Sequence, residues 1–402
     1  MKLSDFIESV EPETILLCGR ESILNKNSLA EIRIQHQDFL FSVRGKSLAI
    51  ELSDNILIAK WLILLDGLVS RLAIFPAGID SEERNHLLRS AHFDLLLTDQ
   101  NILSDSIEIA NINSLPLTED NVQRTTETLA TEWVIATSGT TGSPKLVSHK
   151  LESLINTVKN KPDSKSFTWG LLYNLNRFAG IQVFLQCMMG QNKLVVNDAG
   201  DDLKATIDIF KEQNVNCLSA TPSLWRKMLM LPGIDDLKLQ AITLGGEIAD
   251  SNILRGLASK FPNAKIRHIY ASTEAGVGFS ISDGLPGFPS TLLNNSDANV
   301  SLKLSPSNTL LIKSQSNAKA YLGNSIFDIK DGFIDTGDLI SIENDRCYFK
   351  GRANGAINVG GNKVQPEFIE QIILNFPSIL LASVSAKQSS IMGSLVQATI
   401  VV

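Results

Sequence analysis

Short apolar runs alternate with longer amphipathic segments along most of the chain. Runs such as Ser47–Glu51, Leu95–Thr98 and Trp133–Thr137 have the length and composition of buried strands. Two further runs rich in β-forming residues, Glu31–Ile34 and Phe39–Val43, predict additional strands near the N-terminus. Because helical segments separate most of these runs, the pattern predicts an α/β fold with a largely parallel sheet.

The helical segments carry recognisable start signals. An apolar helix is expected through Trp61–Leu68, and the segment 56–76 is interpreted as this helix and the strand after it. Asp80 with Glu83 predicts the capped start of a helix that runs through Ser90. The later alternation predicts a helix at 202–213, a strand at Val215–Ala220, a helix opened by Pro222, a strand at Ala241–Leu244, a helix at 251–260 and a strand at Ile266–Tyr270.

The pattern changes after residue 296 to short alternating strands, such as Val300–Leu304 and Thr309–Lys313. This alternation predicts an antiparallel β subdomain. A chain of 402 residues is too long for one ordinary core, so at least two packed units are expected. We therefore predict α/β subdomains to about residue 295 and a β subdomain at about 296–351.

Composition narrows the class of protein. Apolar residues make up 44% and charged residues 20%, as in ordinary globular proteins, and a net charge of −7 with dispersed basic residues argues against nucleic-acid binding. The four cysteines include no Cys-x-x-Cys pair, which supports neither a zinc site nor a disulfide framework and predicts a cytoplasmic location. No signal peptide is expected at the start. The most apolar window, 56–75, contains Lys60, Asp66 and Arg71, so no membrane span is expected.

The most specific feature is the loop Thr137-Ser-Gly-Thr-Thr-Gly-Ser-Pro-Lys145, which directly follows a predicted strand. Its glycines let the backbone approach a ligand closely, its hydroxyls add hydrogen-bond donors, and Lys145 adds a compact positive charge that suits phosphate. Gly-Thr-Thr-Gly alone is typical of a flexible turn, but the whole string after a strand predicts a phosphate site. It is not the P-loop, which ends in Gly-Lys-Ser/Thr.

This string resembles the signature of the adenylate-forming superfamily of acyl-CoA synthetases, adenylation domains of nonribosomal peptide synthetases, and luciferases. Three more segments match that superfamily in order: Tyr270–Glu274, Asp335–Asp338 and Lys350–Gly361. They are similar to its adenine and magnesium motif, its ribose motif and its hinge. The apolar segment 56–76 also fits. The resemblance covers nearly the whole chain.

The resemblance implies an ATP- and Mg²⁺-dependent ligase that forms an acyl-AMP, releases pyrophosphate and transfers the acyl group to a thiol of CoA or of a carrier protein. Thr273 would contact the α-phosphate, Glu274 would ligate Mg²⁺, and Lys145 would act with them in catalysis. Each of three residues also has an ordinary structural interpretation. Taken alone, Asp338 is typical of a turn, Glu274 of a helix start and Arg352 of a surface ion pair. The expected nucleotide-binding residues are Thr137, Ser138, Gly139, Thr140, Thr141, Gly142, Lys145, Gly245, Gly246, Glu247, Tyr270, Ala271, Ser272, Thr273, Asp338 and Arg352.

The roles implied within this set are specific. The loop 137–145 would hold the β- and γ-phosphates. Tyr270 would present its ring to adenine, with the backbone of Gly245–Glu247 on the other side. Asp338 would accept hydrogen bonds from both ribose hydroxyls, assisted by Arg352.

The acid pocket is assigned by resemblance to a helix entered by Arg177, Phe178 and Gly180. Amino-acid-activating relatives usually have an aspartate near this entrance, and Arg177 stands there instead. A cation repels an ammonium group, so we expect an acyl or aryl acid rather than an α-amino acid. Arg177 would face a second acidic or polar group, or else point to solvent or form a structural ion pair.

The sequence departs from the superfamily pattern beyond residue 351. Asn354 replaces the usual hinge aspartate, Asn358 replaces a common lysine, and no candidate for the C-terminal catalytic lysine follows Lys387. We expect 352–402 to be a hinge and the beginning of a small α+β domain that is mostly missing, and this chain alone to be poorly active. Two alternatives are a catalytically impaired nucleotide- or acyl-binding member of the fold and an unrelated kinase or ATPase, for which no second phosphate motif exists.

Overall fold

The computed structural model describes residues 2–8, 10–20, 22–104, 107–118, 128–137, 144–158, 167–197, 201–295, 299–323, 329–360, 362–376, 378–389 and 393–402. The chain divides into two compact units. Unit 1 comprises Met1–Ser219, Asp236–Lys238 and Ser316–Phe327, and unit 2 comprises Ala220–Asp235, Leu239–Gln315 and Asp328–Val402.

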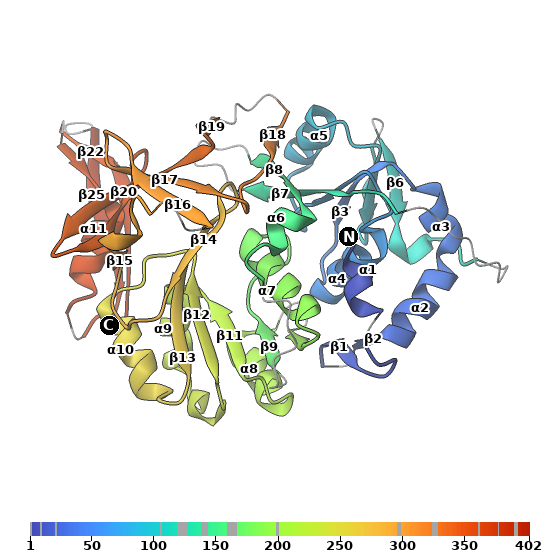
Figure 1. Cartoon of the computed structure of the whole chain (residues 1–402), viewed down its shortest axis with the longest axis horizontal. Helices are drawn as coiled ribbons and strands as arrows, with labels where there is room; N and C mark the ends of the chain where they lie inside the picture. The colour runs from blue at the N-terminus through green and yellow to red at the C-terminus, as the bar shows by residue number, and fades with distance from the viewer. Residues whose placement is uncertain are drawn as a thin grey trace. The chain divides into compact units, whose positions relative to one another are not determined.

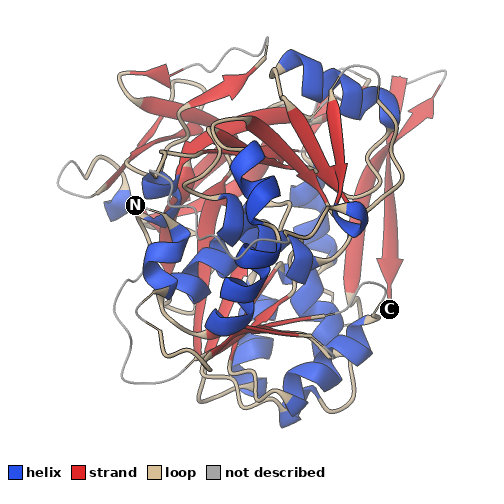
Figure 2. Cartoon of the chain, turned by 90° about the vertical axis from the view of Figure 1, so that its right-hand side faces the viewer, coloured by secondary structure: helices blue, strands red, loops and turns tan. Residues whose placement is uncertain are grey.

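The first sheet of unit 1 is mostly parallel, as the sequence predicted. The strand order is β18-β8-β7-β4-β3-β5-β6; β3, β4, β5, β6 and β7 are parallel, whereas β8 and β18 are antiparallel to their neighbours. Figure 2, in which the right-hand side of Figure 1 faces the viewer, shows helices lying in front of strands. The strand bounds are β3 Ser47–Glu51, β4 Arg71–Ile74, β5 Leu95–Thr98, β6 Glu108–Asn111, β7 Glu132–Thr137, β8 Lys145–Lys150 and β18 Ala320–Leu322.

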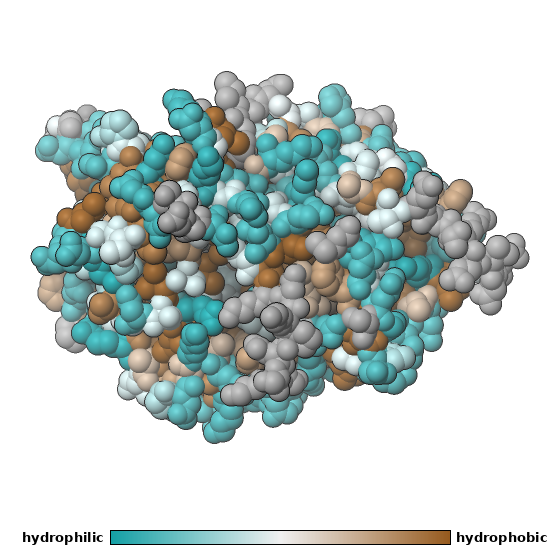
Figure 3. Space-filling model, viewed as in Figure 1, coloured by the Kyte–Doolittle hydropathy of each residue, from teal (hydrophilic) through white to brown (hydrophobic). Residues whose placement is uncertain are grey.

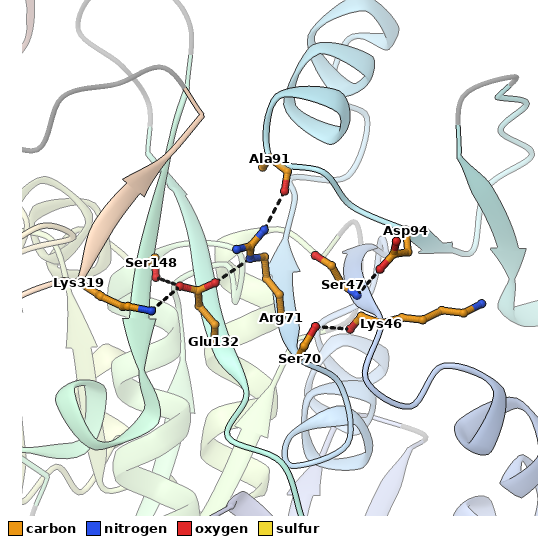
Figure 4. A network of polar contacts seen from close by, with 9 residues as sticks. All are labelled: Lys46, Ser47, Ser70, Arg71, Ala91, Asp94, Glu132, Ser148 and Lys319. Atoms are coloured by element: carbon orange, nitrogen blue, oxygen red, sulfur yellow. Dashed lines mark hydrogen bonds and ion pairs between the residues drawn. The ribbon is translucent and has the colours of Figure 1, made fainter.

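A polar network joins strands β4, β7 and β8 of this sheet (Figure 4). Glu132 on β7 accepts from Arg71 Nε on β4 at 2.7 Å and from Ser148 Oγ on β8 at 2.5 Å, and Lys319 Nζ lies 3.4 Å from it. Arg71 also donates to the carbonyl oxygen of Ala91 at 2.8 Å. Burial alone would raise the pKa of Glu132, but the hydrogen bonds from Ser148 and Arg71 outweigh it, so the pKa is lowered. The network therefore favours an ionised Glu132 between β4 and β8.

Helix α5, Ser81–Ser90, confirms its predicted segment. Helix α4, Asn55–Leu65, overlaps the helix expected at Trp61–Leu68 but begins earlier and ends at Leu65. Asp80 caps α5, since its side chain accepts from the backbone N–H groups of Glu82 and Glu83. A buried ion pair joins α5 to the sheet: Arg84 donates to Glu51 through Nε at 2.5 Å and Nη2 at 2.9 Å. Glu51 is 0% exposed.

The strands expected at Glu31–Ile34 and Phe39–Val43 are wrong, because these residues lie in helices α2, Lys26–Gln35, and α3, Gln37–Ser42. Asn25 and Ser28 form a reciprocal cap at the start of α2. In α3 the buried Phe39 packs edge-on against Trp61 of α4, with ring centroids 5.7 Å apart. Capping and packing thus override the β preference of the apolar side chains.

The second sheet segment of unit 1 runs in the order β11-β9-β10-β1-β2. Its strands are parallel except for β1 with β2. The bounds are β1 Ile15–Cys18, β2 Ile23–Asn25, β9 Thr168–Leu171, β10 Lys193–Val196 and β11 Cys217–Ala220. The other described helices of unit 1 are α1 Leu3–Ile7, α6 Leu151–Ile155, α7 Phe178–Met189 and α8 Leu203–Glu212, with a short 3₁₀ turn at Ile112–Ser114. A second 3₁₀ turn, Ile234–Asp236, lies where the chain passes from unit 2 to unit 1.

Unit 2 begins with the strand–helix alternation that the sequence predicted. Helix α9, Pro222–Leu229, is opened by Pro222, and it packs with α10, Ser251–Lys260, beside strands β12 and β13 (Figure 1). Strand β12, Ala241–Gly245, is parallel to β13, Lys265–Ser272, and β14, Gly276–Ile281, returns antiparallel to β13.

The antiparallel sheet expected after residue 296 is confirmed in unit 2. Its order is β15-β21-β20-β17-β16, with β19 on β20. Its core includes the buried Phe288, Leu310 and Ile340, and Tyr270, Phe279 and Phe349 pack against it. The bounds are β15 Phe288–Pro289, β16 Val300–Leu304, β17 Thr309–Ser314, β19 Ile329–Lys330, β20 Phe333–Glu343 and β21 Arg346–Arg352, with a 3₁₀ turn at Ser290–Leu292.

The last elements form a small antiparallel sheet in the order β23-β22-β25-β24 with one helix, α11. No described residue of α11 is buried, and Phe368 and Ile372 are 41% and 44% exposed. Figure 3 shows hydrophobic surface over this region. The bounds are β22 Ile357–Val359, β23 Asn362–Val364, α11 Pro366–Ile373, β24 Leu381–Ser389 and β25 Gly393–Val401.

The observed fold is thus the α/β class predicted, with parallel strands followed by antiparallel ones. The boundary proposed near residue 351 stays a prediction. Among the described residues, none of the helices has the length and apolar character needed to cross a membrane.

Candidate functional site

The predicted phosphate loop joins two strands of unit 1. Ser138, Gly139, Thr140, Thr141 and Gly142 lie outside the described residues, but both ends of the loop are described. Thr137 ends β7 and pairs with Lys145, which begins β8. The Lys145 ammonium lies 5.0 Å from the centre of the Tyr321 ring. The hairpin therefore brings Thr137 and the lysine to the same end of the sheet.

Two segments of unit 2 leave the sheet at one edge. Strands β12 and β13 are parallel, and Gly245 is paired with Ile269, so Gly246 directly follows β12 and Tyr270 lies near the carboxyl end of β13. Gly246 has a φ of +82°, which a residue with a side chain rarely adopts. The Glu247 carboxylate accepts from the backbone N–H of Ser223 at 2.9 Å, at the start of α9. The Glu247 side chain thus serves a helix terminus.

Thr273 and Glu274 lie in the tight connection between β13 and β14. Ser272 pairs with Gly276 across the hairpin, and the Ser272 hydroxyl accepts from the backbone N–H of Ala275 at 3.0 Å. Gly276 has a φ of +66°. Ala271 is the strand residue before this turn and pairs with Val277. The turn holds Thr273 and Glu274 together at the edge where β13 ends.

Asp338 is held by a structured turn within β20. The Asp335 carboxylate accepts from the backbone N–H of Gly337 at 2.9 Å and from the Thr309 hydroxyl at 2.9 Å. The backbone N–H of Asp338 in turn donates to the Thr336 hydroxyl at 3.2 Å. Gly337 has a φ of +72°. These short-range bonds fix the backbone that carries the Asp338 side chain.

Two partners approach the Asp338 carboxylate from neighbouring strands. The Tyr270 hydroxyl of β13 donates to Oδ2, and Arg352 Nε of β21 lies 3.3 Å from Oδ1. Asp338 and Arg352 are directly opposed across β20 and β21. Burial raises the pKa of Asp338, and the Tyr270 bond and the charge of Arg352 oppose this rise without cancelling it. The structure thus brings together three predicted site residues.

The predicted acid-pocket residues lie at the start of α7 in unit 1. Arg177 is the exposed N-cap residue, and its side chain makes no capping bond. Phe178 is buried with its ring centroid 5.9 Å from that of His149. A Cβ at Gly180 would lie 2.2 Å from the carbonyl oxygen of Asn174, so only glycine fits there. Phe178 and Gly180 therefore serve packing, and Arg177 is the exposed charge at this helix start.

Several residues that support the site were not identified from the sequence. Thr336 and Thr309 lie in or beside the Asp338 turn, and Phe279 and Phe349 stack on Tyr270. The short motif Asp-Thr-Gly-Asp contained a signal for Thr336, because Asp and Thr commonly bond the backbone two residues on. Nothing local in the sequence pairs Phe349 with Tyr270.

A family model described as AMP-binding enzyme matches residues 75–301, which is more than half of the chain. The chain belongs to the AMP-binding enzyme family. This membership confirms the resemblance inferred from the four motifs.

Among curated relatives in the AMP-binding enzyme family, the D-alanine–D-alanyl carrier protein ligase of Staphylococcus aureus strain JH9 is 25% identical over 296 residues. The alignment covers 68% of this chain and 61% of that ligase. The same ligase from S. aureus strain MRSA252 matches with the same identity and the same coverage. The match thus spans about three fifths of the length of these relatives.

Solved structures resemble this chain over almost its whole length. A variant of MenE from E. coli with bound OSB-AMS has a TM-score of 0.79 at 19% identity, covering 98% of this chain and 87% of that one. The o-succinylbenzoate coenzyme A synthetase MenE of Bacillus subtilis, in complex with ATP and magnesium ion, has a TM-score of 0.79 at 18% identity and coverages of 100% and 89%. NpsA of Klebsiella oxytoca, with 3-hydroxyanthranilyl-AMSN, has a TM-score of 0.78 at 14% identity and coverages of 99% and 88%. These similarities establish the fold shared within the AMP-binding enzyme family.

Proposed function

We propose that this protein is an ATP-dependent carboxylic acid ligase that forms an acyl-AMP and passes the acyl group to a thiol of CoA or of a carrier protein. The observation that carries the proposal is the setting of Asp338. A structured turn presents its carboxylate, and Tyr270 connects it to strand β13, which ends at Ser272 directly before Thr273 and Glu274. An adenosine needs an acceptor for its ribose hydroxyls close to the groups that handle its phosphates.

The proposed first step joins two anions. A carboxylate oxygen of the acid bonds to the α-phosphorus of ATP while the bond from that phosphorus to the pyrophosphate oxygen breaks. Repulsion between the reactants makes positioning and charge neutralisation the main tasks of the site. In the second step a thiolate sulfur bonds to the acyl carbon and AMP departs.

The chain's residues fit these tasks. We propose that Thr273 contacts the α-phosphate. The loop between Thr137 and Lys145 would hold the β- and γ-phosphates. Glu274 would hold Mg²⁺ together with phosphate oxygens and water, as this cation usually binds, and Mg²⁺ supplies positive charge against the phosphates. No cluster of three or more metal-binding side chains occurs in the described part of the chain.

If Asp338 binds the ribose, removing its carboxylate should weaken the binding of both AMP and ATP, because both contain this sugar. Replacing Asp338 with alanine should weaken AMP and ATP binding alike by about 10- to 100-fold, since hydrogen bonds to a charged group contribute about 1.5–3 kcal/mol. Isothermal titration calorimetry measures both affinities. Asp235→Ala is the matched control, because that side chain is 60% exposed in its pair with Lys260. Unchanged AMP affinity in Asp338→Ala would show that the ribose binds elsewhere.

We also propose that the substrate is an acyl or aryl acid. Arg177 carries an exposed positive charge at the start of α7, and a helix start already favours anions over cations. An α-ammonium group would be repelled there, whereas a second carboxylate on the substrate would be attracted.

Substrate preference is measured by trapping the acyl-AMP with hydroxylamine over a panel of acids. Aromatic and aliphatic diacids should react at least about tenfold faster than free α-amino acids. A tenfold difference in rate corresponds to about 1.4 kcal/mol, which one unfavourable contact between the ammonium group and Arg177 would supply. D-alanine belongs in the panel because the curated relative is named for it. In Arg177→Gln the advantage of diacids over the matching monoacids should shrink, and a preference for D-alanine would contradict the proposal.

We propose that the protein is located in the cytoplasm. None of the four cysteines forms a disulfide and all four are buried, as expected for a protein of a reducing compartment.

A further inference from the structure

The Tyr270 side chain is fixed by two aromatic neighbours. Its ring stacks on Phe279 of β14, with centroids 5.4 Å apart and planes at 13°, and on Phe349 of β21, with centroids 5.1 Å apart and planes at 3°. Phe288 contacts both of these phenylalanine rings, at 4.6 Å and 5.7 Å between centroids. Aromatic pairs of this kind stabilise the packing beyond the burial of their area. The ring therefore has little freedom, and its hydroxyl is held in one place.

The two oxygens of Asp338 have different partners. Oδ2 accepts from the Tyr270 hydroxyl, and Oδ1 faces Arg352 Nε at 3.3 Å. The Arg352 side chain is 49% exposed, so it is held less firmly than the packed Tyr270 ring. A carboxylate has about four acceptor positions, which leaves room for two further donors. Asp338 can therefore keep its bond to Tyr270 while it accepts from a ligand.

We propose that Tyr270 is a positioning residue whose hydroxyl holds the Asp338 carboxylate in the orientation that accepts a vicinal diol, so that the site selects ribonucleotides over deoxyribonucleotides. This inference rests on the ribose role proposed for Asp338. It assigns the function of Tyr270 to its hydroxyl, because the ring is engaged in packing with Phe279 and Phe349. A ring that only stacked on adenine would need no hydroxyl.

The charges around Asp338 agree with this role. Burial raises the pKa of Tyr270 well above its usual range, and the neighbouring carboxylate raises it further, so the phenol stays protonated and donates. Asp338 is faced by Tyr270 from β13, by Arg352 from β21 and by Asp335 from its own strand. The Tyr270 bond and Arg352 lower the Asp338 pKa, against burial and Asp335. Removing the hydroxyl should raise the Asp338 pKa further.

The test is Tyr270→Phe, which keeps an aromatic ring and removes only the hydroxyl. Calorimetry of AMP, 2′-deoxy-AMP and 3′-deoxy-AMP across pH gives the readout. We expect AMP affinity near neutral pH to fall about tenfold, and the advantage of AMP over the two deoxynucleotides to shrink by a similar factor. Binding requires ionised Asp338, so affinity is lost as pH falls through its pKa. In Tyr270→Phe this loss should occur at a higher pH than in the unaltered protein.

The control is Tyr348→Phe, which changes a half-buried tyrosine one residue from Phe349 on β21. It should leave all three affinities and the pH profile unchanged. If Tyr270→Phe also bound AMP like the unaltered protein, with the same pH profile, the ring alone would matter and the inference would be overturned. In an Asp338→Asn background the Tyr270→Phe change should cost less than it does alone. If Asp338→Ala itself bound AMP normally, the ribose assignment would fail instead, which separates the two ideas.

Discussion

Glu274→Gln should lower acid-dependent exchange of labelled pyrophosphate into ATP by about 10²- to 10³-fold, while ATP binding changes much less. Glu274 lies in the turn between β13 and β14, where neighbouring bonds hold the backbone firmly. The substitution keeps the size of the side chain and removes its charge. A preorganised electrostatic contact at a phosphoryl-transfer centre contributes about 3–4 kcal/mol to the transition state and less to the ground state.

The exchange assay and calorimetry on the same preparations separate these two effects. Glu343→Gln is the matched control, since this glutamate of β20 is 59% exposed and pairs with Lys350. It should exchange pyrophosphate at the unaltered rate. If Glu274→Gln lost ATP affinity and exchange rate by the same factor, Glu274 would stabilise the bound ATP and the transition state equally. If neither changed, Glu274 would not belong to the metal site.

Arg84→Met should lower the free energy of unfolding of unit 1 by about 3–5 kcal/mol. The guanidinium makes two hydrogen bonds to Glu51, which is 0% exposed at the end of β3, and a third to the carbonyl oxygen of Ile79 at 2.9 Å. Removing one member of a buried pair leaves the other charge without compensation, and this is the main cost. Urea unfolding followed by tryptophan fluorescence measures it, because three of the four tryptophans, Trp61, Trp133 and Trp169, belong to unit 1.

Two further variants test the reason for this loss. Arg89→Met changes an exposed arginine on the same helix and should alter stability by no more than about 0.5 kcal/mol. Arg84→Met combined with Glu51→Leu should be more stable than Arg84→Met alone, since two packed apolar side chains can replace a buried ion pair. A double variant that is less stable than the single one would show that the uncompensated charge is not the cause.

Much of the secondary structure was predictable because its signals are local. Helix α8 begins beside its cap Asp202, and α9 begins at Pro222 after its cap Thr221. Strand β12 is a short apolar run that ends at a glycine pair. In each case the deciding interaction lies within four residues of the element, so the sequence around it contains the information.

The two incorrect strands illustrate the limit of such signals. Apolar and β-branched residues between Glu31 and Val43 suit a strand by composition. Their conformation was decided by the Asn25–Ser28 cap and by packing of Phe39 on Trp61, which lies in a different helix. Intrinsic preference amounts to a few tenths of a kcal/mol per residue, and tertiary packing exceeds it.

The sequence alone was enough for the α/β class and the family, and it predicts the candidate nucleotide-site residues, because ordered motifs with fixed local chemistry carry that information. Tertiary structure alone decided what surrounds Asp338. Its bond to Tyr270 joins residues 68 apart in the chain, and its approach to Arg352 depends on the register of β20 and β21. Phe349 reaches Tyr270 only through the common core of the hairpin and the antiparallel sheet. Such contacts depend on how strands pair and how sheets pack, and the short-range periodicity of the sequence predicts neither.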